Sequence, residues 1–468
     1  MKKILLILTV ALLAGTVANA QTPAKKAPAK KEQTKKTATQ GKKQDNKEKE
    51  KKDKNPPIVH PSLGTKMESE GISVKLVGRR QNYAPGHKET AEKDINSPKS
   101  VNIHPSGKKY YVNSLEGGKT VVFDFKSNSK ICSITHRFGP KDAKLWAPSS
   151  GLFAFTHYKN NVNSFMGKPV ESTFSHGGRY LWVPYYRRSF DINAQDPSAV
   201  AVIDTRSDSI VRLFETGPLP KMIATSPDNH YVAVTHWGDN TVGVLDIHSE
   251  NIEDWHYTAC LVVDYKLKLN YSLTESVNRD VNSGYCLRGT VFTPDNKYLL
   301  VGCMGGVGGI AVIELATGKY LGRITGMMSN LRHLVIKNEY IYLSINAAGY
   351  IQRIKLNDFV DAIGNLDESH KSYSLKGWEN CKVPAGARTI VLSPRGDYLF
   401  AACNSASCLA VVDTRQMKLV GTIQADSYPV GLDISKDGHY VLLTSQGRNN
   451  GGGNSVDIFE VNYKPVED

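Results

Sequence analysis

After its first 15 residues, the 468-residue sequence has no run of about 18 apolar residues, so no helical membrane span is expected. It also lacks the CxxCH and CxxC spacings, the lysine-containing phosphate loop and any local pairing of a nucleophile with a base. We therefore expect no metal site and no cofactor. The absence of catalytic motifs favours a protein that is not an enzyme, without deciding the question.

The first 20 residues have the composition of an export signal. Two lysines precede an apolar run, and Ala18-Asn19-Ala20 matches the small-residue cleavage pattern. No cysteine follows the predicted cleavage point, which argues against a lipid anchor at the new N-terminus. We expect an exported protein, either periplasmic or at the cell surface and beyond.

Residues 21–57 contain 13 lysines, five acidic residues and no aromatic or large aliphatic residue. Such a segment cannot bury enough apolar surface to offset the entropy of ordering, so we predict a disordered tether. This tether carries most of the net charge of +14. It is either a solvated spacer or an electrostatic contact with a polyanion, such as a membrane, a cell-wall polymer or nucleic acid.

The remaining chain contains seven copies of a segment of about 25 to 30 residues between Pro98 and Val461. Each copy has an apolar strand, a turn resembling Ser-Pro-Asp-Gly, a tyrosine-containing strand, a polar loop and a Val-x-Val-x-Asp strand. The clearest copies lie at 225–247, 292–315 and 392–414. The apolar residues alternate within short runs, as strands require. The sequence predicts an all-β fold, a seven-bladed β-propeller.

The last copy ends at Val461 with no room for a fourth strand, whereas 72–77 shows strand alternation ahead of the first copy. We predict that this N-terminal strand completes the final blade, and that the propeller spans 70–463. Long insertions in a repeat array often form the binding face. Four such insertions are at 137–168, 184–198, 250–287 and 357–385.

The chain has seven cysteines, an odd number that leaves at least one thiol unpaired unless a second chain supplies a partner. Export permits disulfides, but the spacing assigns none. A propeller of this size has ample core without them, and we expect most of the cysteines to be buried as small apolar residues.

Several repeat segments resemble the YVTN-repeat propellers, including their YncE-like members. The resemblance rests on Tyr111-Val112-Asn113, on Ser226-Pro227-Asp228 with Asn240-Thr241-Val242, and on Val202-Ile203-Asp204-Thr205. It implies an extracytoplasmic propeller of a bacterial envelope, with propeller lactonases and haem d1 propellers as neighbouring families. The turns at 175–178 and 337–339 depart from the motif.

Alignment of the copies identifies one position near the start of each innermost strand that is basic in five of seven copies. Innermost strands line the channel of a propeller, so these residues predict a positive ring at its mouth. Such a ring favours an anionic ligand, and arginine forks suit carboxylate or phosphate. Alternatively, the side chains extend into solvent or pair with acids such as Glu171. The seven positions are Lys99, Val170, Lys221, Arg288, Arg332, Arg388 and Val430.

The loops that follow the tyrosine-containing strands are expected on the same face as the basic ring. Aromatic residues and arginines on such loops are typical of recognition surfaces, although packing is the alternative for each of them. A soft-metal site formed by His236, Cys303 and Cys403 has no supporting spacing. The loop residues predicted to bind a ligand are Tyr185, Tyr186, Arg187, Arg188, His236 and Trp237.

These observations support three hypotheses. The first is a non-catalytic, monomeric binding or scaffold protein of the envelope that recognises an anionic or glycan-like ligand, an envelope polymer or a protein partner. The second is an enzyme of the propeller lactonase type. The third is a binder of nucleic acid or another polyanion that uses the tether and the ring together.

Overall fold

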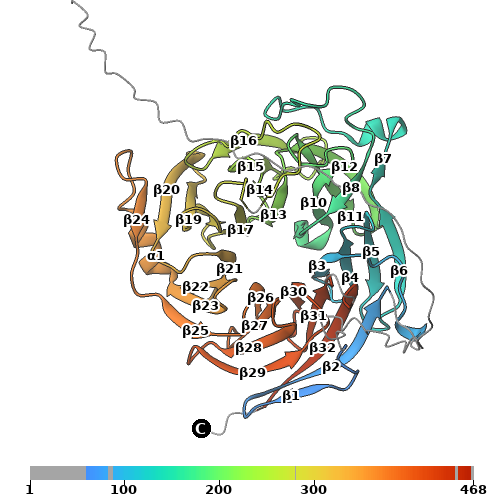
Figure 1. Cartoon of the computed structure of the whole chain (residues 1–468), viewed down its shortest axis with the longest axis vertical. Coiled ribbons are helices and arrows are strands. Elements are labelled where there is room, and N and C mark those ends of the chain that lie inside the picture. The colour runs from blue at the N-terminus through green and yellow to red at the C-terminus, as the bar shows by residue number, and fades with distance from the viewer. Residues whose placement is uncertain (1–59, 83–87, 280, 448–451, 465–468) are drawn as a thin grey trace, which may run out of the picture. The chain divides into compact units, whose positions relative to one another are not determined.

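The chain folds into seven β-sheets that follow one another around a ring (Figure 1). The computed structural model describes residues 60–82, 88–279, 281–447 and 452–464, and all statements about structure concern these residues. The predicted export signal and tether lie outside them. Each sheet contains one of the seven sequence repeats, which confirms the predicted seven-bladed β-propeller.

The first three blades run anticlockwise in colour from blue to green in Figure 1. Blade 1 contains β3 (Pro98–Ile103), β4 (Lys109–Ser114), β5 (Lys119–Asp124) and β6 (Lys130–Thr135). Blade 2 contains β7 (Arg137–Phe138), β8 (Phe165–Pro169), β9 (Thr173–Ser175), β10 (Tyr180–Arg188), β11 (Ser198–Asp204) and β12 (Ser209–Thr216). Blade 3 contains β13 (Pro220–Thr225), β14 (Tyr231–His236), β15 (Thr241–Asp246) and β16 (His256–Val262).

The remaining blades complete the ring. Blade 4 contains β17 (Leu287–Phe292), β18 (Tyr298–Cys303), β19 (Ile310–Glu314), β20 (Lys319–Thr325) and β24 (Ser372–Ser374). Blade 5 contains β21 (Leu331–Lys337), β22 (Tyr340–Ile345), β23 (Tyr350–Lys355) and β25 (Glu379–Lys382). Blade 6 contains β26 (Ala387–Leu392), β27 (Tyr398–Cys403), β28 (Cys408–Asp413) and β29 (Lys418–Gln424). Blade 7 contains β30 (Pro429–Ile434), β31 (Tyr440–Ser445) and β32 (Ser455–Tyr463), joined by β2 (Ile72–Gln81) and β1 (Lys66–Glu68).

Helical structure is confined to short connections. The α-helix α1 (Leu356–Ile363) follows β23, and its Phe359, Ala362 and Ile363 pack into the core between blades 4 and 5. Three short 3₁₀ helices complete the elements, at Lys88–Thr90, Pro140–Leu145 and His176–Gly178.

The alternation of side chains along each strand selects which neighbouring blade they pack against. All six residues of β27 are buried, because the sheet is covered on both faces. Phe400 packs in a cluster with Phe459 of blade 7, whereas Leu399 and Ala401 pack in a cluster with Ile351 of blade 5. Since successive side chains of a strand point to opposite faces, the period-two pattern of the sequence becomes contact with two different blades.

The ring is closed by an N-terminal strand, as the sequence predicted. Strand β2 pairs antiparallel with β32 from Ile72 opposite Tyr463 to Gln81 opposite Ser455, and so extends beyond the predicted 72–77. At this junction Arg79 Nε lies 2.6 Å from Asp457 Oδ1, and the Asp457 side chain is fully buried. A second guanidinium nitrogen of Arg79 donates to the carbonyl of Pro61. Chain closure therefore includes a buried ion pair between its two ends.

Replacing Arg79 with Ala should lower the free energy of unfolding by about 3–5 kcal/mol, because it leaves the buried Asp457 carboxylate without its counterion. The double variant Arg79→Met/Asp457→Leu should recover most of this loss. Denaturant unfolding of both variants, with the exposed Lys75→Ala of the same strand as control, tests the role of the pair. Equal free energies of unfolding for Arg79→Ala and Lys75→Ala would contradict a stabilising role of the ion pair.

Candidate functional site

The innermost strands of six blades begin with the same irregularity in strand pairing. In blade 1, Pro98 pairs with Ser114 and Ser100 pairs with Asn113, which leaves Lys99 as an extra residue. A β-bulge of this kind bends the strand and redirects a side chain. The residues at the equivalent position are Lys99, Lys221, Arg288, Arg332, Arg388 and Val430.

The backbone leading into these bulges also repeats. The residue two positions earlier has a positive φ in all six blades, and only one of the six is a glycine. A non-glycine residue in this region costs roughly 1–2 kcal/mol, so the surrounding structure imposes the conformation. The six residues are Ser97 (φ 50°), Leu219 (54°), Cys286 (51°), Asn330 (69°), Gly386 (93°) and Tyr428 (58°).

The five basic side chains act on one another electrostatically, as expected if they converge. Burial is the main cause that lowers the pKa of Lys99 well below its ordinary value, and the charges of Arg388, Arg288 and Lys221 lower it further. Burial likewise lowers the pKa of Arg288, with Arg332 and Arg388 as the next causes. Each of these effects disfavours the charged form of the side chain. The positive charges of the cluster therefore repel one another.

Blade 2 supplies an acid in place of a sixth base. Glu171 directly follows Val170, the blade 2 residue that the repeat alignment places at the basic position. It is buried, and its Oε1 lies 3.7 Å from Arg288 Nη2, which is beyond hydrogen-bond distance. Among the described residues, this Oε1 has no hydrogen-bond partner. Glu171 thus acts electrostatically on three members of the cluster, Lys99, Arg288 and Arg388, and raises the pKa of each.

Arg388 is the least satisfied member of the cluster. Its side chain is 2% exposed, and burial lowers its pKa, while the Glu171 charge raises it. Within the part of the chain that the structure describes, its Nε and Nη2 have no hydrogen-bond partner. Two buried donors of a guanidinium therefore remain available to an acceptor that enters the site.

Aromatic side chains border the cluster on the blade 3 side. The Lys221 ammonium lies 4.1 Å from the ring centroid of Tyr186 and 5.0 Å from that of Trp237, both within cation–π range. Trp237 is 2% exposed, and its indole N–H donates to the carbonyl of Arg279. The two aromatics lie beside Lys221, as the predicted recognition face requires, but Trp237 is buried there and does not form an exposed surface. Ligand binding by either residue stays a prediction.

Arg279 was missed by the sequence analysis, because it belongs to an insertion with no equivalent in the other repeats. Burial lowers the pKa of Arg279, and smaller electrostatic effects of Tyr186 and Asp191 raise it. Among the described residues, no hydrogen bond is made by any nitrogen of its guanidinium. Arg279 is therefore a further candidate for binding at the edge of the ring.

Arg187 instead stabilises its own loop. Its Nη1 donates to the carbonyls of Asp191 and Ile192, four and five residues later. These contacts direct the guanidinium toward the backbone of the insertion after β10.

Tyr185 and Arg188 do not lie on an exposed recognition surface, which corrects the sequence prediction. The first residues of the predicted loop 184–198 are strand, because β10 continues to Arg188 and pairs with β8. Tyr185 is fully buried and shares a hydrogen bond of 2.9 Å with His136. Arg188 is also fully buried, between the rings of Trp146, Phe155 and Phe165.

His236 is likewise an interior residue and not a surface ligand, contrary to the prediction. Its two ring nitrogens contact Thr216 Oγ1 at 2.7 Å and Thr241 Oγ1 at 2.8 Å. Burial lowers its pKa to about 3, with a smaller effect from Lys266. The ring is neutral and satisfied by its neighbours near pH 7.

The cysteines follow the prediction of burial, since five of the seven are buried and two are half-buried. Cys303 and Cys403 belong to different core clusters. Neither lies with His236 in a group of potential metal ligands among the described residues.

Comparison with known proteins supports the fold alone. No protein-family model and no curated protein matches the chain, so the resemblance to YVTN-repeat propellers stays a prediction. The structure is similar to that of Kuenenia stuttgartiensis hydrazine synthase, with a TM-score of 0.54 and 14% identity, over 82% of this chain and 100% of that one. It is also similar to the β-propeller domain of Myceliophteria thermophila Cps50 (Swd1), with a TM-score of 0.52 and 12% identity, over 78% of this chain and 96% of that one.

The buried His236 should make stability depend on pH. Its pKa of about 3 in the folded protein lies below the ordinary 6.5, so its contribution is complete above pH 6.5 and is lost as the pH falls toward 3. Between pH 7 and pH 5 this loss is about 2 kcal/mol. In His236→Gln, the decrease in unfolding free energy over this interval should be smaller by that amount. The exposed His256→Gln should behave as wild type, and an unchanged pH dependence in His236→Gln would contradict the assignment.

Proposed function

We propose that this protein is a non-catalytic β-propeller that binds a small anionic ligand among Lys99, Lys221, Arg288, Arg332 and Arg388. The fold is consistent with a binding or scaffold role. The observation that carries the proposal is Arg388, a buried guanidinium with two hydrogen-bond donors unused by the described residues, next to other cations.

The energetics of the cluster support a ligand of opposite charge. Buried charges are costly unless they are paired and hydrogen-bonded, and the nearest carboxylate, Glu171, makes only a loose contact with Arg288. An anion placed among the five cations offsets the repulsion and accepts the unused hydrogen bonds. The repeated bulge, which brings the side chains of separate blades together, provides the preorganisation that binding requires.

The chemistry of the donors indicates the class of ligand. Guanidinium groups present planar pairs of N–H donors that match carboxylate and phosphate oxygens. Tyr186, next to Lys221, adds an aromatic surface at the border of the site. We therefore propose a small molecule with more than one carboxylate or phosphate group.

We also propose that the protein binds its ligand outside the cytoplasm. The export signal and the YVTN resemblance of the sequence support an exported protein of a bacterial envelope. Among the described residues, no helix is long and apolar enough to cross a membrane. The lysine-rich tether at 21–57 would then keep the propeller near an anionic surface.

Single Ala substitutions of Arg288, Arg332 and Arg388 should each weaken anion binding by at least tenfold, because each removes a charged donor. Citrate and inorganic phosphate are suitable probes, titrated calorimetrically into the full chain. Glu171→Gln should tighten binding several-fold, since it removes a negative charge that acts on Lys99, Arg288 and Arg388. The exposed Arg395→Ala is the matched control.

Two outcomes would contradict the proposal. One is citrate affinity that is equal in wild type and all three arginine variants. The other is the absence of citrate and phosphate binding combined with a lower thermal midpoint in Arg388→Ala, which would show that the cluster stabilises the fold without a ligand. A deletion of residues 21–57 that alone abolishes binding would favour the polyanion hypothesis instead.

A further inference from the structure

Three of the predicted insertions converge on a cavity whose lining includes no member of the basic cluster. Its walls come from two segments of blade 2, 152–157 between β7 and β8 and 195–197 between β10 and β11, and from 266–270 between blades 3 and 4. Pro218 and Asp239, which flank β13 and β14, complete it. The cavity has a volume of about 460 Å³, within the range of small-molecule sites.

Side chains of the blade 2 insertion hold the other two insertions in place. The Asp196 carboxylate accepts hydrogen bonds from the backbone N–H groups of Thr156 and Tyr158, both at 2.9 Å. The Gln195 amide bonds both the N–H and the carbonyl of Tyr271, at 2.7 and 3.2 Å.

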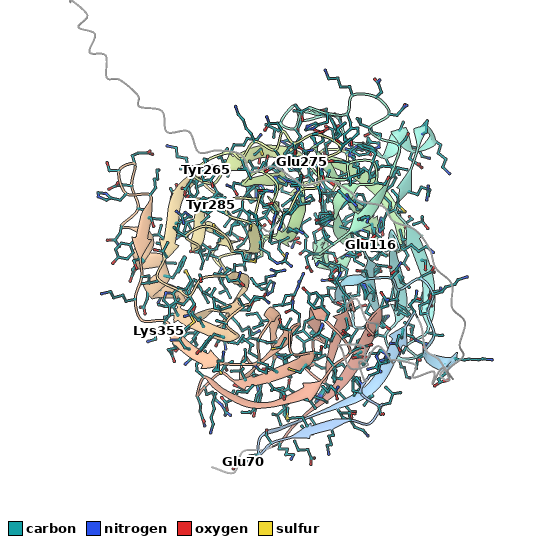
Figure 2. All side chains as sticks on the ribbon, in the orientation of Figure 1. Glu70, Glu116, Tyr265, Glu275, Tyr285 and Lys355 are labelled. Atoms are coloured by element: carbon teal, nitrogen blue, oxygen red, sulfur yellow. The ribbon has the colours of Figure 1, made fainter. Side chains whose placement is uncertain are left out.

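The third insertion, on which Figure 2 labels Tyr265, Glu275 and Tyr285, has further anchors. Asn193 donates to the carbonyl of Glu275 at 2.5 Å. The N–H of Leu267 donates to the carbonyl of Asp239 at 3.0 Å. The walls are thus tied to one another, and the cavity is formed before any ligand arrives.

The cavity combines an apolar surface with one loose pair of opposite charges. Leu152, Phe153 and Leu269 line it, and the Phe153 ring is held edge-on against His236 and Tyr257. Asp239 is 6% exposed, and its Oδ1 accepts a hydrogen bond of 2.6 Å from Thr241. The more exposed Lys266 ammonium stands 3.7 Å from Asp239 Oδ2, beyond hydrogen-bond distance.

This pair of charges is poorly compensated. Burial raises the pKa of Asp239 to about 6, and Thr241 and Lys266 offset only part of that effect. A buried carboxylate gains from a closer cation with good hydrogen-bond geometry, and the lysine gains from an anion at the cavity mouth. A ligand with an ammonium beside a carboxylate satisfies both at once.

We propose that this cavity binds a free α-amino acid with an apolar side chain. Its ammonium donates to Asp239, its carboxylate pairs with Lys266, and its side chain packs against Leu152, Phe153 and Leu269. The site differs in ligand and location from the basic cluster. This proposal therefore does not depend on the proposed anion binding.

L-Phenylalanine is the probe for this site, titrated into the full chain and followed by calorimetry or ligand-observed NMR. Wild-type protein should bind it in the millimolar range or tighter. N-acetyl-L-phenylalanine lacks the ammonium and L-phenylalanine amide lacks the carboxylate, so each should bind at least tenfold more weakly. Equal binding of the amide would overturn the role of the carboxylate, and with it the proposal.

Three substitutions test the named contacts. Asp239→Asn and Lys266→Met should each weaken L-phenylalanine binding at least tenfold, since each removes one of the two charges. Ala154→Phe, at an exposed position of the wall, should block the cavity without altering a charge. Asp254→Asn is the matched control outside the cavity, and Arg388→Ala should leave this binding unchanged.

Thermal unfolding of each variant separates loss of the site from loss of the fold. The proposal is overturned if wild-type protein does not bind L-phenylalanine at 10 mM, a concentration about ten times a dissociation constant of 1 mM. It is also overturned if folded Asp239→Asn and folded Ala154→Phe bind as well as wild type.

Discussion

The pairing of β2 with β32 is the constraint on which the rest of the propeller depends. The other sheets are built from consecutive strands, apart from the short β24 that joins blade 4, but blade 7 needs a strand from the opposite end of the chain. A ring that is closed has no unpaired gap between its first and last blades, so the blades are held around one axis. Only then do the second residues of separate innermost strands meet.

Bringing these basic side chains together costs electrostatic free energy, which the rest of the fold offsets. The bulge recurs in six blades, and in five of them it holds a lysine or an arginine. The left-handed residues that precede it add strain, since five of the six are not glycine. Strain and repulsion at one place are typical of functional sites, where the surrounding structure supports a local arrangement that is unfavourable by itself. The proposed anion would neutralise part of the positive charge and accept hydrogen bonds from the unused donors of Arg388.

The two candidate sites arise from different parts of the sequence. The basic cluster uses an equivalent position of the repeat, so its symmetry follows from the blades. The cavity uses segments that interrupt the repeat, which Asp196 and Gln195 tie together. Repeats thus supply the scaffold and the central charges, whereas the insertions build an asymmetric pocket at one edge of the ring.

Much of the fold was accessible from the sequence. The seven copies, their period-two alternation and the unpaired strand at 72–77 predicted the blades and their closure, and aligned positions predicted the basic cluster. The loop residues were predicted less well. Tyr185 and Arg188 have the composition of a recognition loop, but β10 extends through them into the core. His236 looks like a ligand residue in sequence, yet two threonines and full burial make it a structural one.

The sequence by itself determined the number of blades, the order of the three repeated strands in each and the positions of the repeated cations, because all of these follow from local periodicity. Only the tertiary structure decided which polar side chains are buried, how Glu171 faces Arg288, and where three distant insertions meet around Asp239. The physical reason is that burial and charge pairing depend on contacts between residues far apart in the chain, which periodicity does not record.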